Sequence, residues 1–269
     1  MKRLVYLPMA ALMMAFVPVS CNKDNPSGTK TITVPEAVDL GLVLKRADGT
    51  TYHLMWASLN LGASKEYEYG NYYAWGETEP KKDYSWATYA HANGAREKIT
   101  KYCMYGNADF WGAEGRSPDN ESKLLPSDDA AHVKLGGKWR MPTVQEFQAL
   151  LNLKNDKDHY KFEWYIPLDE NGNEILDRNN LAIHGLKITR IASGASIFLP
   201  GGGFREGKEP GSRGMSGSGF YWQSILRLPS ESTYPPYVTT AYINMNDFGN
   251  MVNAESRCCG LSIRPVWEE

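Results

Sequence analysis

The sequence predicts an α+β fold, with two helices, a twisted antiparallel sheet and long loops. Helical periodicity is concentrated in one central stretch, Asp128–Leu151. The segments before and after it carry the turn signals and alternating apolar residues that are typical of strands. Polar stretches rich in Gly, Asn, Ser and charged residues lie between these segments and predict the long loops.

The first half of the central stretch predicts a short helix. Ser127 is a candidate N-cap, and Asp128 and Asp129 follow it, where carboxylates favour the positive end of the helix dipole. Gly136 and Gly137 supply the positive φ angles that end such a helix.

The second half predicts a strand followed by another helix. Lys138–Met141 is expected to be extended, because Pro142 disfavours the α conformation in the residue before it. Thr143 and Glu146 have the T-x-x-E spacing of a capping box. The apolar residues of the helix then fall on one face: Val144, Phe147, Leu150 and Leu151.

The N-terminal part of the domain predicts a hairpin. A first strand begins with Val38–Val43, and Asp48-Gly49 is a two-residue turn signal between it and the sequence TTYHLMWA. In the second strand, Tyr52, Leu54 and Trp56 share one face.

Two polar segments predict excursions from the sheet. Lys81–Lys123 is expected to be long and irregular, with a short helix near Ala95–Tyr102. Asn155–Asn180 is expected to be an insertion before the next hairpin. That hairpin pairs Leu186–Ile191 with Ser196–Leu199.

The last segment predicts four strands: Phe220–Ile225, Val238–Met245, Met251–Ala254 and Gly260–Val266. Within Thr240–Asn246, apolar Ala241, Ile243 and Met245 alternate with Tyr242, Asn244 and Asn246. One face is therefore expected to be core, and the other offers an aromatic ring and two amides.

Composition is that of an ordinary globular protein. The 269 residues carry a formal net charge of −2, with 22% charged and 42% hydrophobic residues. No run of Lys and Arg occurs in the sequence, which argues against nucleic acid as a partner. Residues 35–269 are expected to form one domain.

The N-terminus predicts export and a lipid anchor. Lys2-Arg3 and the apolar run Leu4–Val19 form a signal peptide over residues 1–20. Ser20-Cys21 resembles the processing site of a bacterial lipoprotein, which predicts lipid attachment at Cys21; an ordinary secretory signal with a chance cysteine is the alternative. Residues 21–34 are polar and predict a flexible tether.

Two residues suggest on which side of the membrane the anchored domain lies. Lys23-Asp24 resembles the surface-export signals of Bacteroidetes lipoproteins. The expected location is therefore the outer membrane with the domain exposed on the cell surface, and a periplasm-facing orientation is the alternative.

Three further cysteines leave their redox state open. A disulfide bond between Cys103 and either Cys258 or Cys259 is one possibility in an exported protein. The other possibility is that all three cysteines are free, buried thiols. Adjacent cysteines without C-x-x-C spacing or paired histidines do not indicate a zinc site. No metal or other cofactor is expected.

The sequence contains fragments of two catalytic motifs but completes neither of them. Gly201–Gly203 lacks the Gly-Lys-Ser/Thr ending of a P-loop, and Gly214–Ser218 does not complete a G-x-S-x-G elbow. Glu77 and Glu79 are two residues apart, too close in sequence to flank a glycosidic bond from opposite sides. The sequence therefore predicts a protein that is not an enzyme.

Several motifs carry a family resemblance. They are VDLGL at 38–42, YGNYYAWGETEP at 69–80, KYC at 101–103, GGKWRMPTVQEFQALL at 136–151, SIFLPGGGFR at 196–205, FYW at 220–222 and GLSIRPV at 260–266. Together these motifs resemble the Fibrobacter succinogenes major paralogous domain family. The resemblance implies a C-type-lectin-like fold and a variable ligand face near the last strands.

The resemblance and the residues together give three hypotheses for function. The first is a cell-envelope binding module for a glycan or protein ligand, with contacts from Trp75, Glu77, Trp222, Tyr242, Asn244 and Asn246. The second is a structural or fimbrial accessory subunit. The third, an enzyme like the formylglycine-generating relatives of the fold, needs a suitably placed cysteine pair that this sequence does not show.

Overall fold

The computed structural model describes residues 32–103, 119–210, 217–226, 237–244, 248–249 and 254–269. Ile32–Glu269 forms one compact unit, and it begins slightly before the domain boundary predicted at residue 35. The predicted signal peptide and the lipid-attachment residue Cys21 lie outside the described residues. In the described part of the chain, no helix has the length and apolar character needed to cross a bilayer.

The first sheet has the order β1-β2-β13-β3 and is antiparallel throughout. Its strands are β1 (Ala37–Lys45), β2 (Thr51–Ala57), β13 (Val266–Glu268) and β3 (Trp139–Arg140). The predicted Asp48-Gly49 turn joins β1 to β2: the Asp48 carboxylate accepts from the Thr50 amide at 2.9 Å and Gly49 has φ +88°. Leu54 and Trp56 are buried on one face of β2 as expected, with Tyr52 half-buried beside them.

Helix α2 (Ala130–Leu135) begins later than the sequence suggested. Ser127 belongs to a 3₁₀ turn, Pro126–Asp128, and the N-cap is Asp129 instead. The Asp129 carboxylate accepts from the backbone amides of Ala131 and His132. Its second oxygen accepts from the Met141 amide at 2.8 Å, so a buried carboxylate that links two segments replaces the exposed serine as the cap.

Helix α3 (Val144–Asn152) confirms the capping box. The Thr143 hydroxyl accepts from the Glu146 amide at 3.2 Å, and the Glu146 carboxylate accepts from the Thr143 amide at 2.7 Å. Phe147, Leu150 and Leu151 are buried as predicted.

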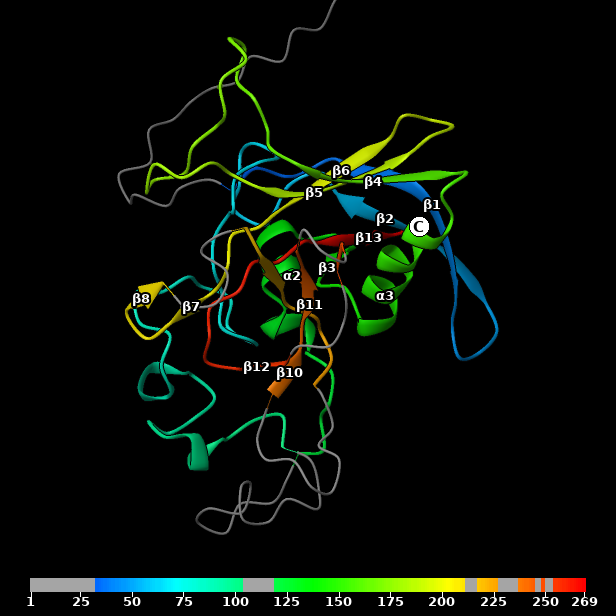
Figure 1. Cartoon of the computed structure of the whole chain (residues 1–269). Helices are drawn as coiled ribbons and strands as arrows, with labels where there is room; N and C mark the ends of the chain where they lie inside the picture. Colours follow the sequence, from blue (N-terminus) through cyan, green and yellow to red (C-terminus); the bar gives the residue numbers. More distant parts are fainter. Residues whose placement is uncertain (1–31, 104–118, 211–216, 227–236, 245–247, 250–253) are drawn as a thin grey trace, which may run out of the picture. The chain divides into compact units, whose positions relative to one another are not determined.

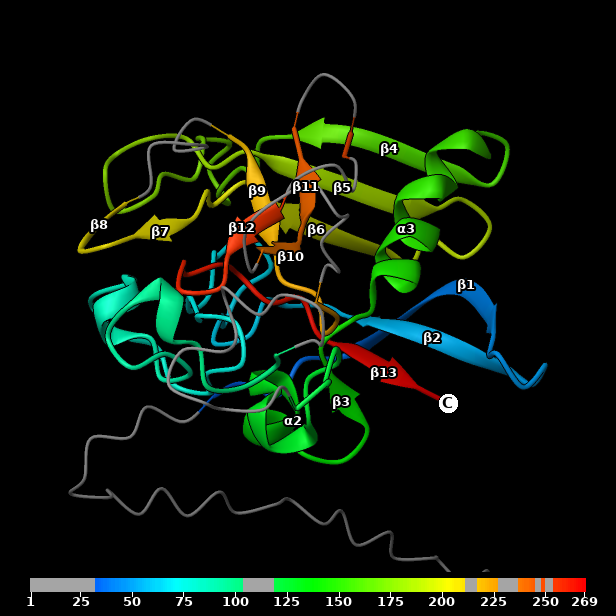
Figure 2. The same cartoon turned by 90° about the horizontal axis from the view of Figure 1, so that it is seen from below.

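A second antiparallel sheet has the order β4-β5-β6. Its strands are β4 (Tyr160–Tyr165), β5 (Gly185–Arg190) and β6 (Ser196–Pro200), so the predicted hairpin is confirmed. The prediction that Asn155–Asn180 is only an insertion is wrong, because β4 lies within it and pairs along all of β5. Helix α3 lies against this sheet in both views (Figures 1 and 2).

The C-terminal strands are shorter and placed differently from the prediction. They are β9 (Gly219–Tyr221), β10 (Tyr237–Thr239), β11 (Ala241–Ile243) and β12 (Ala254–Ser256). β9 pairs with β11, and β10 pairs with β12. The expected strand Gly260–Val266 forms only isolated bridges at Gly260, Leu261 and Ser262 before β13 begins.

The described part of the irregular segment Lys81–Lys123 contains two 3₁₀ turns, Trp86–Thr88 and Arg96–Lys98; the second stands where a short helix was expected. Besides the turn at Pro126–Asp128, a further 3₁₀ turn follows α3 at Leu153–Asn155. The remaining strands, β7 (Arg205–Glu206) and β8 (Glu209–Pro210), form a small hairpin.

Two large apolar clusters hold these elements together. In the first, Phe147 of α3 packs with Trp56 of β2, with β5 and β6, and with Tyr221 of β9. The second contains Trp75, Trp222, Met141 and the start of α2. With two α-helices and mainly antiparallel sheets in the described residues, the α+β prediction is confirmed.

Candidate functional site

Trp75 and Trp222 are core residues and not surface residues, so the expectation that they contact ligand is corrected. Both side chains are 0% exposed. The Trp75 indole donates to the Gln223 carbonyl at 2.7 Å, and the Trp222 indole donates to the Tyr73 carbonyl at 2.6 Å. Because each indole N–H donates to a carbonyl within two residues of the other tryptophan, the pair joins two segments that are distant in sequence.

Glu77 is engaged within its own loop. Its carboxylate forms an ion pair with Lys81 at 2.8 Å and accepts from the Ala90 amide at 2.8 Å. These contacts show that Glu77 stabilises the loop that follows Trp75.

The predicted face of β11 is only partly open. Tyr242 is half-buried, and its ring lies 4.9 Å from that of Phe220, while its hydroxyl is 3.2 Å from that of Ser218. Asn244 is also half-buried, and Asn246 lies outside the described residues. On the opposite face Ile243 is buried, as predicted.

The cysteines take the free form. Cys103, Cys258 and Cys259 are all buried thiols. A hydrogen bond with Cys258, together with burial, raises the pKa of the Cys259 thiol. A protonated, buried thiol is a poor nucleophile.

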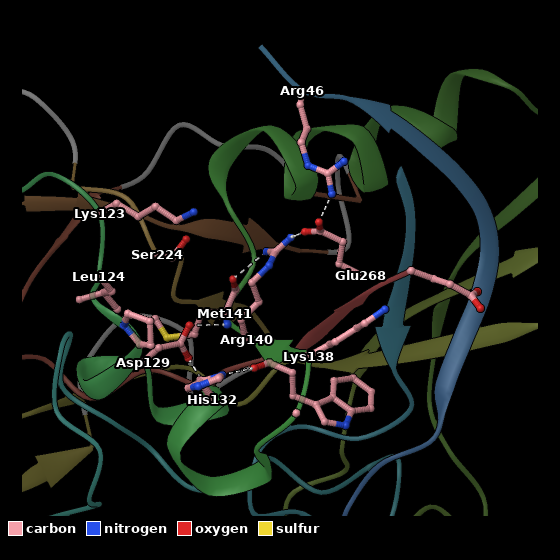
Figure 3. A pocket seen from close by; sticks show the side chains of 14 residues that line it. Arg46, Lys123, Leu124, Asp129, His132, Lys138, Arg140, Met141, Ser224 and Glu268 are labelled. Atoms are coloured by element: carbon pink, nitrogen blue, oxygen red, sulfur yellow. Dashed lines mark hydrogen bonds and ion pairs between the residues drawn. The ribbon is translucent and has the colours of Figure 1, made fainter. Parts of the chain in front are cut away.

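A cleft of about 670 Å³ lies beside α2, β3 and β13 (Figure 3). Its lining is mainly apolar, with charged groups among the apolar ones, which is the usual composition of ligand sites. The lining residues are Arg46, Lys123, Leu124, Pro126, Asp129, His132, Gly137, Lys138, Trp139, Arg140, Met141, Ser224, Glu268 and Glu269.

An ion-pair network fixes one side of this cleft. Arg140 binds Glu146 through two hydrogen bonds of 2.8 and 2.6 Å and binds Glu268 at 2.9 Å, and Arg46 also pairs with Glu268. Burial opposes ionisation of Glu146, but its bonds to Arg140 outweigh this effect and hold its pKa below the ordinary value. These ion pairs hold the side chains of Arg46, Arg140 and Glu268 in fixed positions along the cleft (Figure 3).

Asp129 and His132 are committed to the framework of the cleft. Burial raises the pKa of Asp129, although three backbone amides donate to it. His132 Nδ1 lies 3.2 Å from the Trp139 carbonyl. Because a carbonyl only accepts, Nδ1 is the donor in this hydrogen bond.

Ser224 gives the cleft its most distinctive polar group. Its side chain is 3% exposed, and its hydroxyl oxygen has no hydrogen-bond partner among the residues that the structure describes. Its backbone is fixed, because its amide donates to Pro142 and its carbonyl accepts from Leu124, both at 2.8 Å. A buried hydroxyl without a partner has a cost that a bound polar group relieves.

Sequence patterns did not identify the residues of this cleft as a binding site. Arg140 and Glu146 belong to the central motif, but only the fold brings them beside Glu268. Ser224 follows Trp222 in a predicted strand and carries no local signal. In the described chain, no group of three or more His, Cys, Asp or Glu side chains is arranged to ligate a metal.

No protein-family model, curated protein or solved structure matches this chain. Its function is therefore inferred from the chemistry of its own residues.

Proposed function

We propose that this protein is a cell-envelope lipoprotein with a C-type-lectin-like fold that acts as a non-catalytic binding module for a glycan or protein ligand. The observation that carries the proposal is the cleft of Figure 3. It combines a mainly apolar lining with the unpartnered hydroxyl of Ser224, and the ion pairs of Arg140 with Glu146 and Glu268 fix its wall. Such a surface supplies directional polar contacts and apolar area together, which both ligand classes require.

The arrangement of polar groups supports binding over catalysis. The Ser224 hydroxyl has no base within hydrogen-bond reach in the described chain, so nothing activates it as a nucleophile. The carboxylate of Asp129 is occupied by backbone amides and that of Glu146 by Arg140, Tyr52 and Thr143. These groups hold the cleft in shape.

Removing the Ser224 hydroxyl is the direct test. The full-length protein, purified in detergent, is applied to a glycan array and, separately, cross-linked to envelope proteins. Ser224→Ala is expected to weaken binding to the ligand so identified about tenfold, the value of one hydrogen bond to a buried group. Its melting temperature should stay close to that of the wild type, because the hydroxyl makes no internal bond.

The matched control is Ser127→Ala. Ser127 is exposed on the neighbouring 3₁₀ turn, and it is not one of the residues that line the cleft. Wild-type affinity in Ser224→Ala would place the binding site elsewhere. A protein that binds no array glycan and co-purifies only with assembly subunits would support the structural or fimbrial alternative.

Anchoring is tested separately at Cys21. Cys21→Ser is expected to move the protein from the membrane fraction to the soluble fraction and to abolish incorporation of labelled palmitate, because the thiol is the proposed lipid-attachment site. Membrane fractionation unchanged by the substitution, with no palmitate in the wild type, would refute the lipoprotein assignment.

A further inference from the structure

A second cleft, of about 680 Å³, lies apart from that of Figure 3 and shares no residue with it. Its walls come from segments far apart in sequence, residues 70–84, Arg178 and the β7–β8 hairpin. Five cationic side chains line it: Lys81, Lys82, Arg178, Arg205 and Lys208. Asp83 is the only acidic lining residue in the described chain.

Four of these cations are available to a ligand. Lys81 is used internally, since its ammonium group pairs with Glu77 at 2.8 Å and donates to the Thr88 carbonyl at 3.0 Å. The other four form no ion pair with any residue that the structure describes. Glu206 and Glu209 of the hairpin are exposed and do not line the cleft.

Two tyrosines hold the walls in place. The Tyr84 hydroxyl donates to the Tyr72 carbonyl at 2.6 Å, and the Tyr72 hydroxyl donates to the Gly202 carbonyl at 2.5 Å. The backbones of Tyr84 and Gly207 exchange hydrogen bonds of 2.7 and 3.0 Å. The Arg205 guanidinium lies 5.0 Å from the centre of the Tyr72 ring, so this charge is already oriented when a ligand arrives.

We propose that this second cleft binds an acidic saccharide, through carboxylate or sulfate groups on its sugar rings. The unpaired cations supply the anion contacts. Asp83 Oδ1 is buried without a partner in the described residues, and Asn71 lines the same cleft. A carboxylate oxygen and an amide oxygen accept hydrogen bonds from hydroxyl groups. A sugar offers such hydroxyl groups, and a simple anion such as sulfate does not.

The charge distribution favours a short acidic sugar over nucleic acid. The whole chain has a formal net charge of −2, so its long-range field does not attract a long polyanion. Four cations without an ion pair in the described residues line this one cleft, where ligand groups come within a Debye length of several of them together.

Direct binding measurements with the full-length protein test the proposal. The probes are galacturonate oligosaccharides, sulfated dextran oligosaccharides, neutral dextran oligosaccharides of the same length and a single-stranded oligonucleotide. One or both acidic sugars should bind, with affinity that falls as salt rises, and the neutral sugar should not. The two acidic probes distinguish carboxylate from sulfate recognition.

Charge removal locates the site. The triple variant Lys82→Gln, Arg178→Gln, Lys208→Gln should weaken binding of the acidic sugar about tenfold or more. The control triple Lys45→Gln, Lys98→Gln, Lys157→Gln removes the same charge from exposed residues outside the cleft and should change affinity by less than about twofold. All six side chains are exposed, so both variants should fold.

Asp83→Ala separates saccharide recognition from simple anion binding. Removing the carboxylate should weaken binding of the acidic sugar, which loses an acceptor for a hydroxyl, and should strengthen binding of inorganic sulfate, which loses a repelling charge. The proposal is overturned if the neutral sugar or the oligonucleotide binds as well as the acidic sugars. It is also overturned if no acidic sugar binds at low salt, if both triple variants lose affinity equally, or if Asp83→Ala changes both ligands in the same direction.

Discussion

Replacing Arg264 by leucine is expected to lower the free energy of unfolding by about 3–5 kcal/mol. The Arg264 side chain is 0% exposed, and burial lowers its pKa to about 10. Its guanidinium donates to Asn60 Oδ1 and the Ala57 carbonyl at 2.8 Å each, and to the Phe198 carbonyl at 2.5 Å. One side chain thus joins the end of β2 to β6 of the other sheet.

Leucine fills much of the same volume but leaves these acceptors without their donor, and each such loss is costly in a dry interior. Arg264→Lys keeps a positive charge but cannot reproduce the fixed fork of donors, so it should give an intermediate loss. Lys157→Ala, at an exposed lysine, should change stability by less than about 0.5 kcal/mol. Urea unfolding measures all three, and an unchanged midpoint in Arg264→Leu would show that the two sheets do not depend on this residue.

Replacing Phe147 by alanine is expected to cost about 3–5 kcal/mol, the usual loss when a buried phenylalanine leaves a cavity. The Phe147 side chain is 0% exposed. Its ring centre lies 4.8 Å from that of Trp56 in an edge-to-face arrangement and 5.9 Å from that of Tyr221. The substitution therefore removes the ring contacts of α3 with Trp56 of β2 and Tyr221 of β9.

Two substitutions on nearby helices calibrate this result. Thr143→Ala removes the N-cap of the same helix without opening the core and should cost about 1 kcal/mol. Val133→Ala, at a partly exposed position of α2, should cost less than about 0.5 kcal/mol. Equal, negligible losses for Phe147→Ala and Thr143→Ala in urea would show that α3 does not organise the core.

Local signals located most elements because their causes are local. The capping box of Thr143 and Glu146, the Asp48-Gly49 turn and the hairpin of β5 and β6 each depend on residues close in sequence. The predictions were wrong where a distant partner decided the outcome. Strand β4 lies within a stretch that is polar overall, although its own residues are mostly aromatic, and it pairs with β5 along its whole length.

The candidate sites depended far more on the tertiary structure. Trp75 and Trp222 are aromatic residues near loops and strands, a pattern that suits a binding face equally well. Only the fold shows that both rings are buried in one apolar cluster, with each indole N–H donating to a backbone carbonyl close to the other ring. Tyr242 has an alternating pattern that predicts exposure, yet Phe220 covers part of it from the neighbouring strand.

Local patterns were enough to predict the α+β class, the two helices with the cap of α3, and the principal hairpins, because backbone propensities, caps and apolar periodicity act within a few residues. Only the tertiary structure placed Ser224 in the same cleft as Arg140 and Glu268, and gathered Lys82, Arg178 and Lys208 around another. The reason is that electrostatic and hydrogen-bonding contacts depend on the distance between atoms in space. These residues are many positions apart in the chain, so their sequence separation does not reveal that they lie close together.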